Sequence, residues 1–155
     1  MANLTLITVP TSPYAARVRI QALEKGLDLK LVDPPGGMGS AELRALSPFG
    51  KVPVLQAKGR TFIESSAIQE YLEDIFPEPS LRGKNAAETA QVRTMVCAID
   101  QYLFPLIFPL RLLQPKDEGV AETLADISDR LNQCLNQMAT LCGGEGYLVG
   151  ARLSL

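Results

Sequence analysis

The sequence of 155 residues contains no histidine. Without an imidazole side chain, the chain cannot build a Ser-His triad, a Cys-His pair or a histidine metal site. It has only three cysteines, Cys97, Cys134 and Cys142. They lack the spacing of metal ligands and fall in helical patterns, which favours reduced, half-buried thiols. We therefore expect no metal site and exclude hydrolases that depend on a Ser-His or Cys-His pair.

Neither sign of charge is in excess in this sequence. It has 15 basic and 17 acidic residues, a net charge of −2, and both halves are similarly balanced. This balance gives no basic surface of the kind that binds nucleic acid or anionic lipid. The sequence also shows no signal-peptide pattern and no apolar run long enough to cross a bilayer. We expect a cytoplasmic protein with neither a nucleic-acid partner nor a membrane partner.

Strand and helix signals alternate through residues 1–80. The apolar residues 4–9 predict a buried strand. Ser12-Pro13 is typical of a helix start, because serine caps a helix and proline fits its first turn. Next come a predicted strand at 27–32 and a short helix at 40–46. Two strands at 52–56 and 61–63 are predicted to form a hairpin around Lys58-Gly59, and a helix capped by Ser65 follows. The order β-α-β-α-β-β-α predicts an α/β domain over this half.

Residues 81–155 are predicted to form a separate helical domain. Proline and glycine gather among polar residues at 76–83, which is typical of a linker. Two long helical patterns follow, around residues 92–106 and 120–141. The second half of the chain is therefore expected to be all-α.

Two prolines, Pro105 and Pro109, fall within the first of these helical patterns. A proline inside a helix removes a backbone hydrogen bond and clashes with the preceding turn. We therefore expect a kink or a break near Phe104.

Three short motifs stand at the ends of the predicted strands and helices of the first half. They are Ser12-Pro13-Tyr14, Gly50-Lys51-Val52-Pro53-Val54-Leu55 and Glu64-Ser65-Ser66-Ala67-Ile68. In order and separation they resemble the N-terminal, thioredoxin-like domain of cytosolic glutathione transferases that use serine, such as the zeta, theta, phi and tau classes and their bacterial relatives. The resemblance extends over about residues 4–82 and implies glutathione as co-substrate.

Ser12 is the catalytic residue that this resemblance implies. Its hydroxyl would donate to the glutathione sulfur, and a hydrogen bond to a charged group contributes about 1.5–3 kcal/mol. That suffices to favour the thiolate without a general base. An ordinary N-cap serine is the plain alternative for Ser12-Pro13. Ser12-Pro13-Tyr14-Ala15 also lacks both sulfurs of the Cys-Pro-Tyr-Cys motif of glutaredoxins, so dithiol exchange is excluded here.

The other two motifs imply the remaining glutathione contacts. The resemblance implies a cis peptide bond between Val52 and Pro53, with the Val52 backbone pairing with the cysteinyl unit like an added strand. It implies that Lys51 reaches the glycyl carboxylate, and that Glu64 and Ser65 hold the γ-glutamyl end. A trans proline, a solvated lysine and a capping serine beside an unrelated acid are the alternatives.

A second, apolar substrate would lie between the two predicted domains, and the residues expected there are Tyr14, Pro35, Tyr102 and Leu106. The resemblance implies a homodimeric glutathione transferase that conjugates the thiolate to a small electrophile, as in detoxification. Two alternatives stay open. One is a non-catalytic binding module of the same fold. The other is a zeta-like isomerase or a glutathione-dependent lyase, although the Ser-Ser-Cys cluster of the zeta class is missing.

The run at residues 150–155 resembles the start of the central helix in the second domain of this family, which opens with a Ser-x-x-Asp capping box. The aspartate of that box would fall beyond Leu155. We therefore expect residues 81–155 to be an incomplete helical domain, belonging to a longer protein or, as the alternative, to a naturally short form.

Overall fold

The computed structural model describes residues 3–111, 113–114, 119–143 and 146–155. The chain divides into two compact units. The first comprises residues 1–81 together with Leu155, and the second comprises residues 82–154.

The first unit is built on a mixed sheet of four short strands. In the order β2-β1-β3-β4, β1 pairs with β2 in parallel and with β3 antiparallel, and β4 pairs antiparallel with β3. The hairpin between β3 and β4 turns at Lys58 and Gly59, whose φ angles of 50° and 75° match the right-handed strand twist. The strands are β1 (Leu4–Ile7), β2 (Leu29–Val32), β3 (Val54–Ala57) and β4 (Arg60–Ile63).

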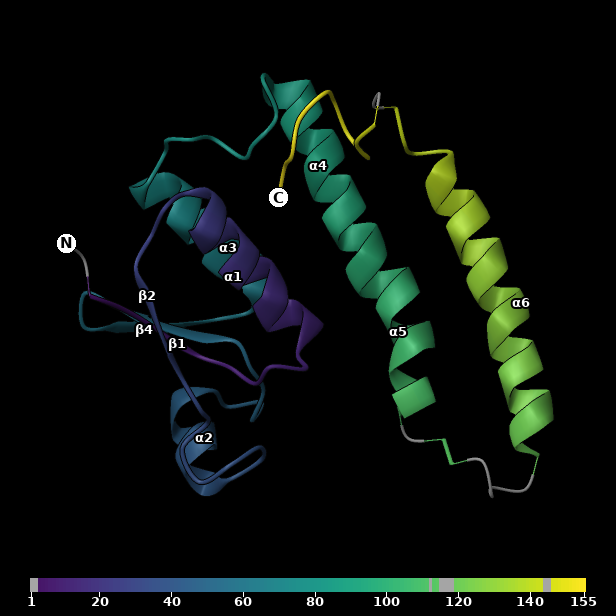
Figure 1. Cartoon of the computed structure of the whole chain (residues 1–155), viewed down its shortest axis with the longest axis horizontal. Coiled ribbons are helices and arrows are strands. Elements are labelled where there is room, and N and C mark those ends of the chain that lie inside the picture. Colours follow the sequence, from purple (N-terminus) through teal and green to yellow (C-terminus); the bar gives the residue numbers. More distant parts are fainter. Residues whose placement is uncertain (1–2, 112, 115–118, 144–145) are drawn as a thin grey trace. The chain divides into compact units, whose positions relative to one another are not determined.

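Helices cover both faces of this sheet, as Figure 1 shows. Helices α1 (Pro13–Glu24) and α3 (Ser65–Ile75) cover one face, and the short α2 (Ala41–Leu46) covers the other. Successive strand residues point to opposite faces, so the core has two parts. The part beneath α1 and α3 consists of Leu4, Leu6, Val18, Leu55, Ala57, Ile68 and Leu72, and the part beneath α2 of Ile7, Leu43, Val52 and Val54. The predicted thioredoxin-like order β-α-β-α-β-β-α is confirmed.

Ser12 and Ser65 differ in how they start their helices. Ser12 is the N-cap of α1, as predicted, and its Oγ accepts a hydrogen bond from the Ala15 N–H at 3.1 Å. The prediction that Ser65 caps α3 is wrong. Glu64 is the N-cap, with a φ of 65° and no side-chain capping bond, and Ser65 is the first helical residue. A positive φ is unfavourable for a residue with a Cβ atom, and such strain is found preferentially at functional sites.

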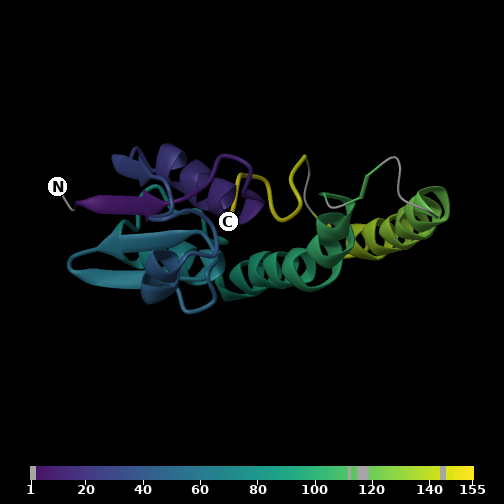
Figure 2. The same ribbon diagram turned by 90° about the horizontal axis from the view of Figure 1, so that it is seen from below.

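The second unit contains two antiparallel helical arms. The first arm begins with α4 (Ala86–Ala98), whose N-cap Asn85 accepts from the Glu88 N–H at 3.0 Å. It continues through a π-helical turn, α5 and a 3₁₀ turn, and Figure 2 shows it from below. The return arm is α6, which lies beside the first arm in Figure 1. The remaining bounds are Ile99–Leu103 for the π-helical turn, Phe104–Ile107 for α5, Phe108–Arg111 for the 3₁₀ turn and Val120–Ala139 for α6.

Near Phe104, where the sequence predicted a kink or a break, the helix has a π-helical turn. Pro105 has no N–H to continue the regular pattern. The turn before it widens, and the Phe104 N–H donates to the Ile99 carbonyl, five residues back. The helix thus accommodates the proline through a π-helical turn, with no break there.

Solvent reaches more of the second unit than the sequence suggested. Cys134 is buried, whereas Cys97 and Cys142 are exposed, so the expectation of three half-buried thiols is wrong for these two. All three thiols are free. None of the helices in the described parts of the chain is long and apolar enough to cross a membrane.

Candidate functional site

The sheet register brings the three sequence motifs to one edge of the first unit. Ile7 at the end of β1 lies opposite Val54 at the start of β3, and Val54 lies opposite Ile63 at the end of β4. The segment leading to Ser12 follows the end of β1 at this edge, and Lys51 and Val52 come just before the start of β3 there. Glu64 and Ser65 follow β4 directly. The strands therefore place all three motifs at the same end of the sheet.

Ser12 is held by the backbone on both sides. Its N–H donates to the Val9 carbonyl at 3.1 Å, and its carbonyl accepts from the Ala16 N–H at 2.9 Å. The hydroxyl oxygen accepts the Ala15 N–H, and only 8% of the residue is exposed. A hydroxyl has one donor and two acceptor positions. Capping uses an acceptor position, so the O–H remains able to donate to a ligand.

Val52 offers its backbone at the same edge. The Val52–Pro53 peptide bond is cis, as predicted. Among the residues that the structure describes, neither the N–H nor the C=O of Val52 has a hydrogen-bonding partner. Such groups are ready to pair with an extended peptide. Lys51, immediately before it, is exposed and supplies a positive charge.

The start of α3 provides a second polar subsite. Ser65 is 5% exposed, and its hydroxyl has no hydrogen-bonding partner among the described residues. The side chain of Glu64 does not cap the helix and is exposed. An N-terminus whose N–H groups are not capped attracts a carboxylate through these donors and the helix dipole. Glu64 itself can accept from an ammonium group.

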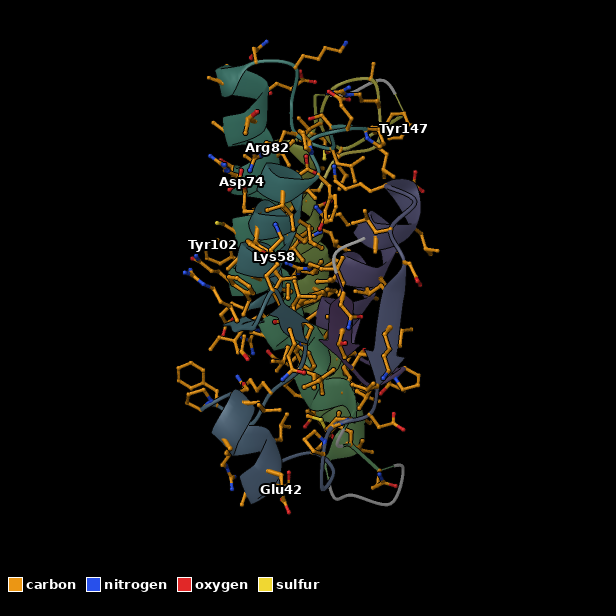
Figure 3. The ribbon with its side chains drawn as sticks, turned by 90° about the vertical axis from the view of Figure 1, so that its left-hand side faces the viewer. Glu42, Lys58, Asp74, Arg82, Tyr102 and Tyr147 are labelled. Atoms are coloured by element: carbon orange, nitrogen blue, oxygen red, sulfur yellow. The ribbon has the colours of Figure 1, made fainter. Side chains whose placement is uncertain are left out.

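The residues predicted to line the second-substrate pocket belong to different units. Tyr14 and Pro35 lie in the first unit, where the Arg17 guanidinium carbon is 5.2 Å from the centroid of the Tyr14 ring. Tyr102 and Leu106 lie in the second, and Tyr102 is 63% exposed and projects from its helix in Figure 3. The pocket that these four residues would form stays a prediction.

Sequence reasoning missed two features of the first unit. The Glu78–Pro79 peptide bond is also cis, and no local motif singled it out. A set of buried polar contacts also joins α1 to α3, including an ion pair of 2.8 Å between Lys25 Nζ and Glu73 Oε1. Its only sequence signal is the spacing of four between the polar residues Gln21 and Lys25 on a helix that packs on the core.

The fold and the arrangement of motifs define a thioredoxin-like protein with an additional helical unit. Residues 6–80 match the family model described as "Glutathione S-transferase, N-terminal domain". A probable glutathione transferase from Aplysia californica is 37% identical over 83 residues, covering 54% of this chain and 90% of that protein. The chain belongs to the glutathione S-transferase family.

Two further similarities extend over almost the whole chain. A maleylacetoacetate isomerase from Pseudomonas aeruginosa is 31% identical over 160 residues, covering 98% of this chain and 76% of that protein. A glutathione S-transferase from Methylobacterium radiotolerans, solved in complex with glutathione sulfonate, superposes with a TM-score of 0.77 at 29% identity. That superposition covers 98% of this chain and 73% of the solved one. Family membership thus includes the helical unit.

Proposed function

We propose that this protein is a glutathione transferase in which the Ser12 hydroxyl stabilises the glutathione thiolate for attack on a small, largely apolar electrophile. The observation that carries the proposal is the geometry of Ser12 at the N-terminus of α1. Its oxygen is fixed by the Ala15 N–H, which leaves the hydroxyl proton for the sulfur. The dipole of α1 adds a favourable potential at the same point.

The energy required is small enough for these two effects to supply. A free thiol has a pKa of about 8.5, so only a few per cent is thiolate at neutral pH. Lowering that pKa to about 7 needs about 2 kcal/mol of preferential stabilisation. A hydrogen bond to a charged sulfur contributes about 1.5–3 kcal/mol, and the helix dipole adds about 0.3–1 kcal/mol. No general base is required.

The rest of the site fits the other parts of glutathione. The unpaired backbone groups of Val52 suit the cysteinyl unit, and the charge of Lys51 suits the glycyl carboxylate. The start of α3 at Ser65 suits the γ-glutamyl carboxylate, and Glu64 suits its ammonium group. These assignments support glutathione as the co-substrate. Dimerisation, a cytoplasmic location and the pocket for the electrophile stay predictions.

A glutathione-dependent isomerase is the second candidate, because the Pseudomonas aeruginosa relative is a maleylacetoacetate isomerase. The Ser-Ser-Cys cluster of the zeta class is missing from this sequence, which favours the transferase. Turnover of maleylacetoacetate exceeding that of every conjugation substrate would support the isomerase instead. Retention on immobilised glutathione without any turnover would support a binding module.

The test measures glutathione conjugation across a panel of electrophiles and compares Ser12→Ala with Ser12→Gly. Both variants remove the hydroxyl, but glycine is nearly as good an N-cap as serine whereas alanine costs about 1 kcal/mol of stability. We expect both to lose most of kcat, by about tenfold or more, and only Ser12→Ala to lower Tm appreciably. Unchanged turnover in Ser12→Gly would remove Ser12 from the mechanism.

A further inference from the structure

Polar side chains form a line of contacts between α1 and α3 in the first unit. Three of them are spaced by four residues along α1 and therefore share one face of that helix. Their partners occupy the facing side of α3, at spacings of three and four. We call these six residues the α1–α3 ladder: Arg17, Gln21 and Lys25 on or next to α1, and Ser66, Gln69 and Glu73 on α3.

At its N-terminal end, the α1–α3 ladder has two contacts near the starts of the two helices. Arg17 Nη1 donates to Ser66 Oγ at 3.4 Å, and Gln69 Nε2 donates to the Arg17 carbonyl at 3.5 Å. In the middle, Gln21 Nε2 donates to the backbone carbonyl of Gln69 at 2.9 Å and to Glu73 Oε1 at 3.2 Å. From one pair to the next, the residue numbers increase along both helices. The helices therefore run in the same direction, and their N-termini lie at the same end.

At its C-terminal end, the α1–α3 ladder has a buried ion pair. Lys25 Nζ lies 2.8 Å from Glu73 Oε1, and the two side chains are 0% and 1% exposed. Lys25 also donates to the carbonyls of Phe76 and Pro79, at 2.8 Å and 2.6 Å, and Glu73 Oε2 accepts from the Leu81 N–H at 3.3 Å. Charges buried in this way must be paired and fully hydrogen-bonded, so the pair tolerates no sliding of one helix along the other.

Each helix of this pair carries one end of the proposed glutathione site. Ser12, at the start of α1, holds the sulfur, and Ser65, at the start of α3, holds the γ-glutamyl carboxylate. The distance between these two points depends on the axial register of α1 against α3. Apolar packing between the helices is non-directional and fixes register weakly, whereas hydrogen bonds fix it strongly.

We propose that the α1–α3 ladder sets this register and so determines which length of γ-linked peptide the site accepts. Gln21 and Gln69 are positioning residues in this scheme, because they link the buried ion pair to the two N-termini without lying at either subsite. The proposal rests on glutathione being the ligand, as argued above. In this proposal the ladder determines selectivity for peptide length, although none of its six residues holds the ligand at either subsite.

The experiment compares two ligands that differ by one methylene group between the sulfur and the α-carboxylate. These are S-methylglutathione and its β-aspartyl analogue, which is shorter by that group. Calorimetry gives the ratio of the two Kd values for the wild type, Gln21→Met and Gln69→Met. Two controls accompany them. Gln91→Met makes the same chemical change at an exposed position of α4, and Leu4→Ala weakens the core where β1 pairs with Ala57, at the other end of the sheet.

We expect the wild type to prefer S-methylglutathione by about 10–200-fold, the usual value of one misplaced methylene. Gln21→Met removes the bonds to both the Gln69 backbone and Glu73, and should reduce this preference by at least about fivefold. Gln69→Met removes only the 3.5 Å bond to the Arg17 carbonyl and should reduce it by less. The controls should keep it, even though Leu4→Ala lowers Tm. A role limited to stability changes the folded fraction but leaves the Kd ratio of the folded molecules unchanged.

Two results would overturn the inference. One is an unchanged Kd ratio in both Gln21→Met and Gln69→Met, and the other is a wild type that binds the two ligands equally. Because the readout is binding, a wild type that discriminates between the ligands but conjugates no electrophile would refute the transferase and leave the ladder supported. Failure to bind S-methylglutathione at all would refute both.

Discussion

Replacing Lys25 with methionine should strongly destabilise the first unit. The change leaves the Glu73 carboxylate, whose side chain is 1% exposed, without its cation. It also removes the donor to the carbonyls of Phe76 and Pro79. Removing one partner of a buried ion pair typically costs about 3–5 kcal/mol, because the remaining charge stays desolvated. That is a large share of the about 5–15 kcal/mol that stabilises a typical domain.

The double variant Lys25→Met/Glu73→Met separates the charge from the packing. Two methionines leave no buried charge, and replacing a buried pair by apolar residues is often neutral. Here the N–H of Leu81 and the amide of Gln21 lose an acceptor, so recovery should be incomplete. We expect the double variant to regain at least half of the stability that Lys25→Met loses, which is about 2 kcal/mol.

The assay is urea unfolding followed by far-UV circular dichroism, because the chain contains no tryptophan for fluorescence. Glu24→Met provides the control, since Glu24 lies at the exposed end of α1 and the same kind of change there should cost little. A loss below about 1 kcal/mol in Lys25→Met, or a double variant that is no more stable than Lys25→Met, would refute the assignment of Glu73 as a charge that depends on Lys25.

Three other predictions concern single sites. Lys51→Ala should raise the KM for glutathione about tenfold but leave that for γ-glutamylcysteine unchanged, because the dipeptide lacks the glycyl unit; equal losses would place Lys51 elsewhere. Glu64→Gly should raise stability by about 1 kcal/mol by relieving the φ of 65°, while weakening glutathione binding; lower stability in denaturant unfolding would contradict this. Asn85→Ala should cost about 1 kcal/mol in thermal unfolding and Asn85→Ser almost nothing, since both asparagine and serine can cap α4; equal costs would argue against capping.

Local sequence signals predicted the fold well where a single residue type determines the geometry. Ser12 before Pro13 identified the start of α1, and Lys58-Gly59 identified the turn of the hairpin, because each pattern has a direct conformational cause. The first three strands were predicted longer than they are, and β4 was predicted one residue shorter. β1 ends at Ile7, two residues before the predicted end, because apolar residues indicate burial but do not show which residues are hydrogen-bonded to a neighbouring strand.

The parts that sequence did not predict depend on contacts between distant segments. Nothing near Glu64 specifies its positive φ, which is imposed where the end of β4 meets α3. The pairing of Lys25 with Glu73 depends on how two helices align across 48 residues of chain, and no periodicity within either helix reveals it. For the candidate site, the motifs identified the residues, while the register of β1, β3 and β4 was needed to show that they meet at one edge.

The most direct measurement of the central claim is the pKa of the glutathione thiol when it is bound to the protein. Titration of the thiolate absorbance in the ultraviolet gives this value for the wild type and for Ser12→Gly, which keeps the helix start nearly intact. If Ser12 stabilises the thiolate, the pKa should be about 7 in the wild type and return toward about 8.5 in the variant. A wild-type pKa of about 8.5, or the same lowered value in both proteins, would contradict it.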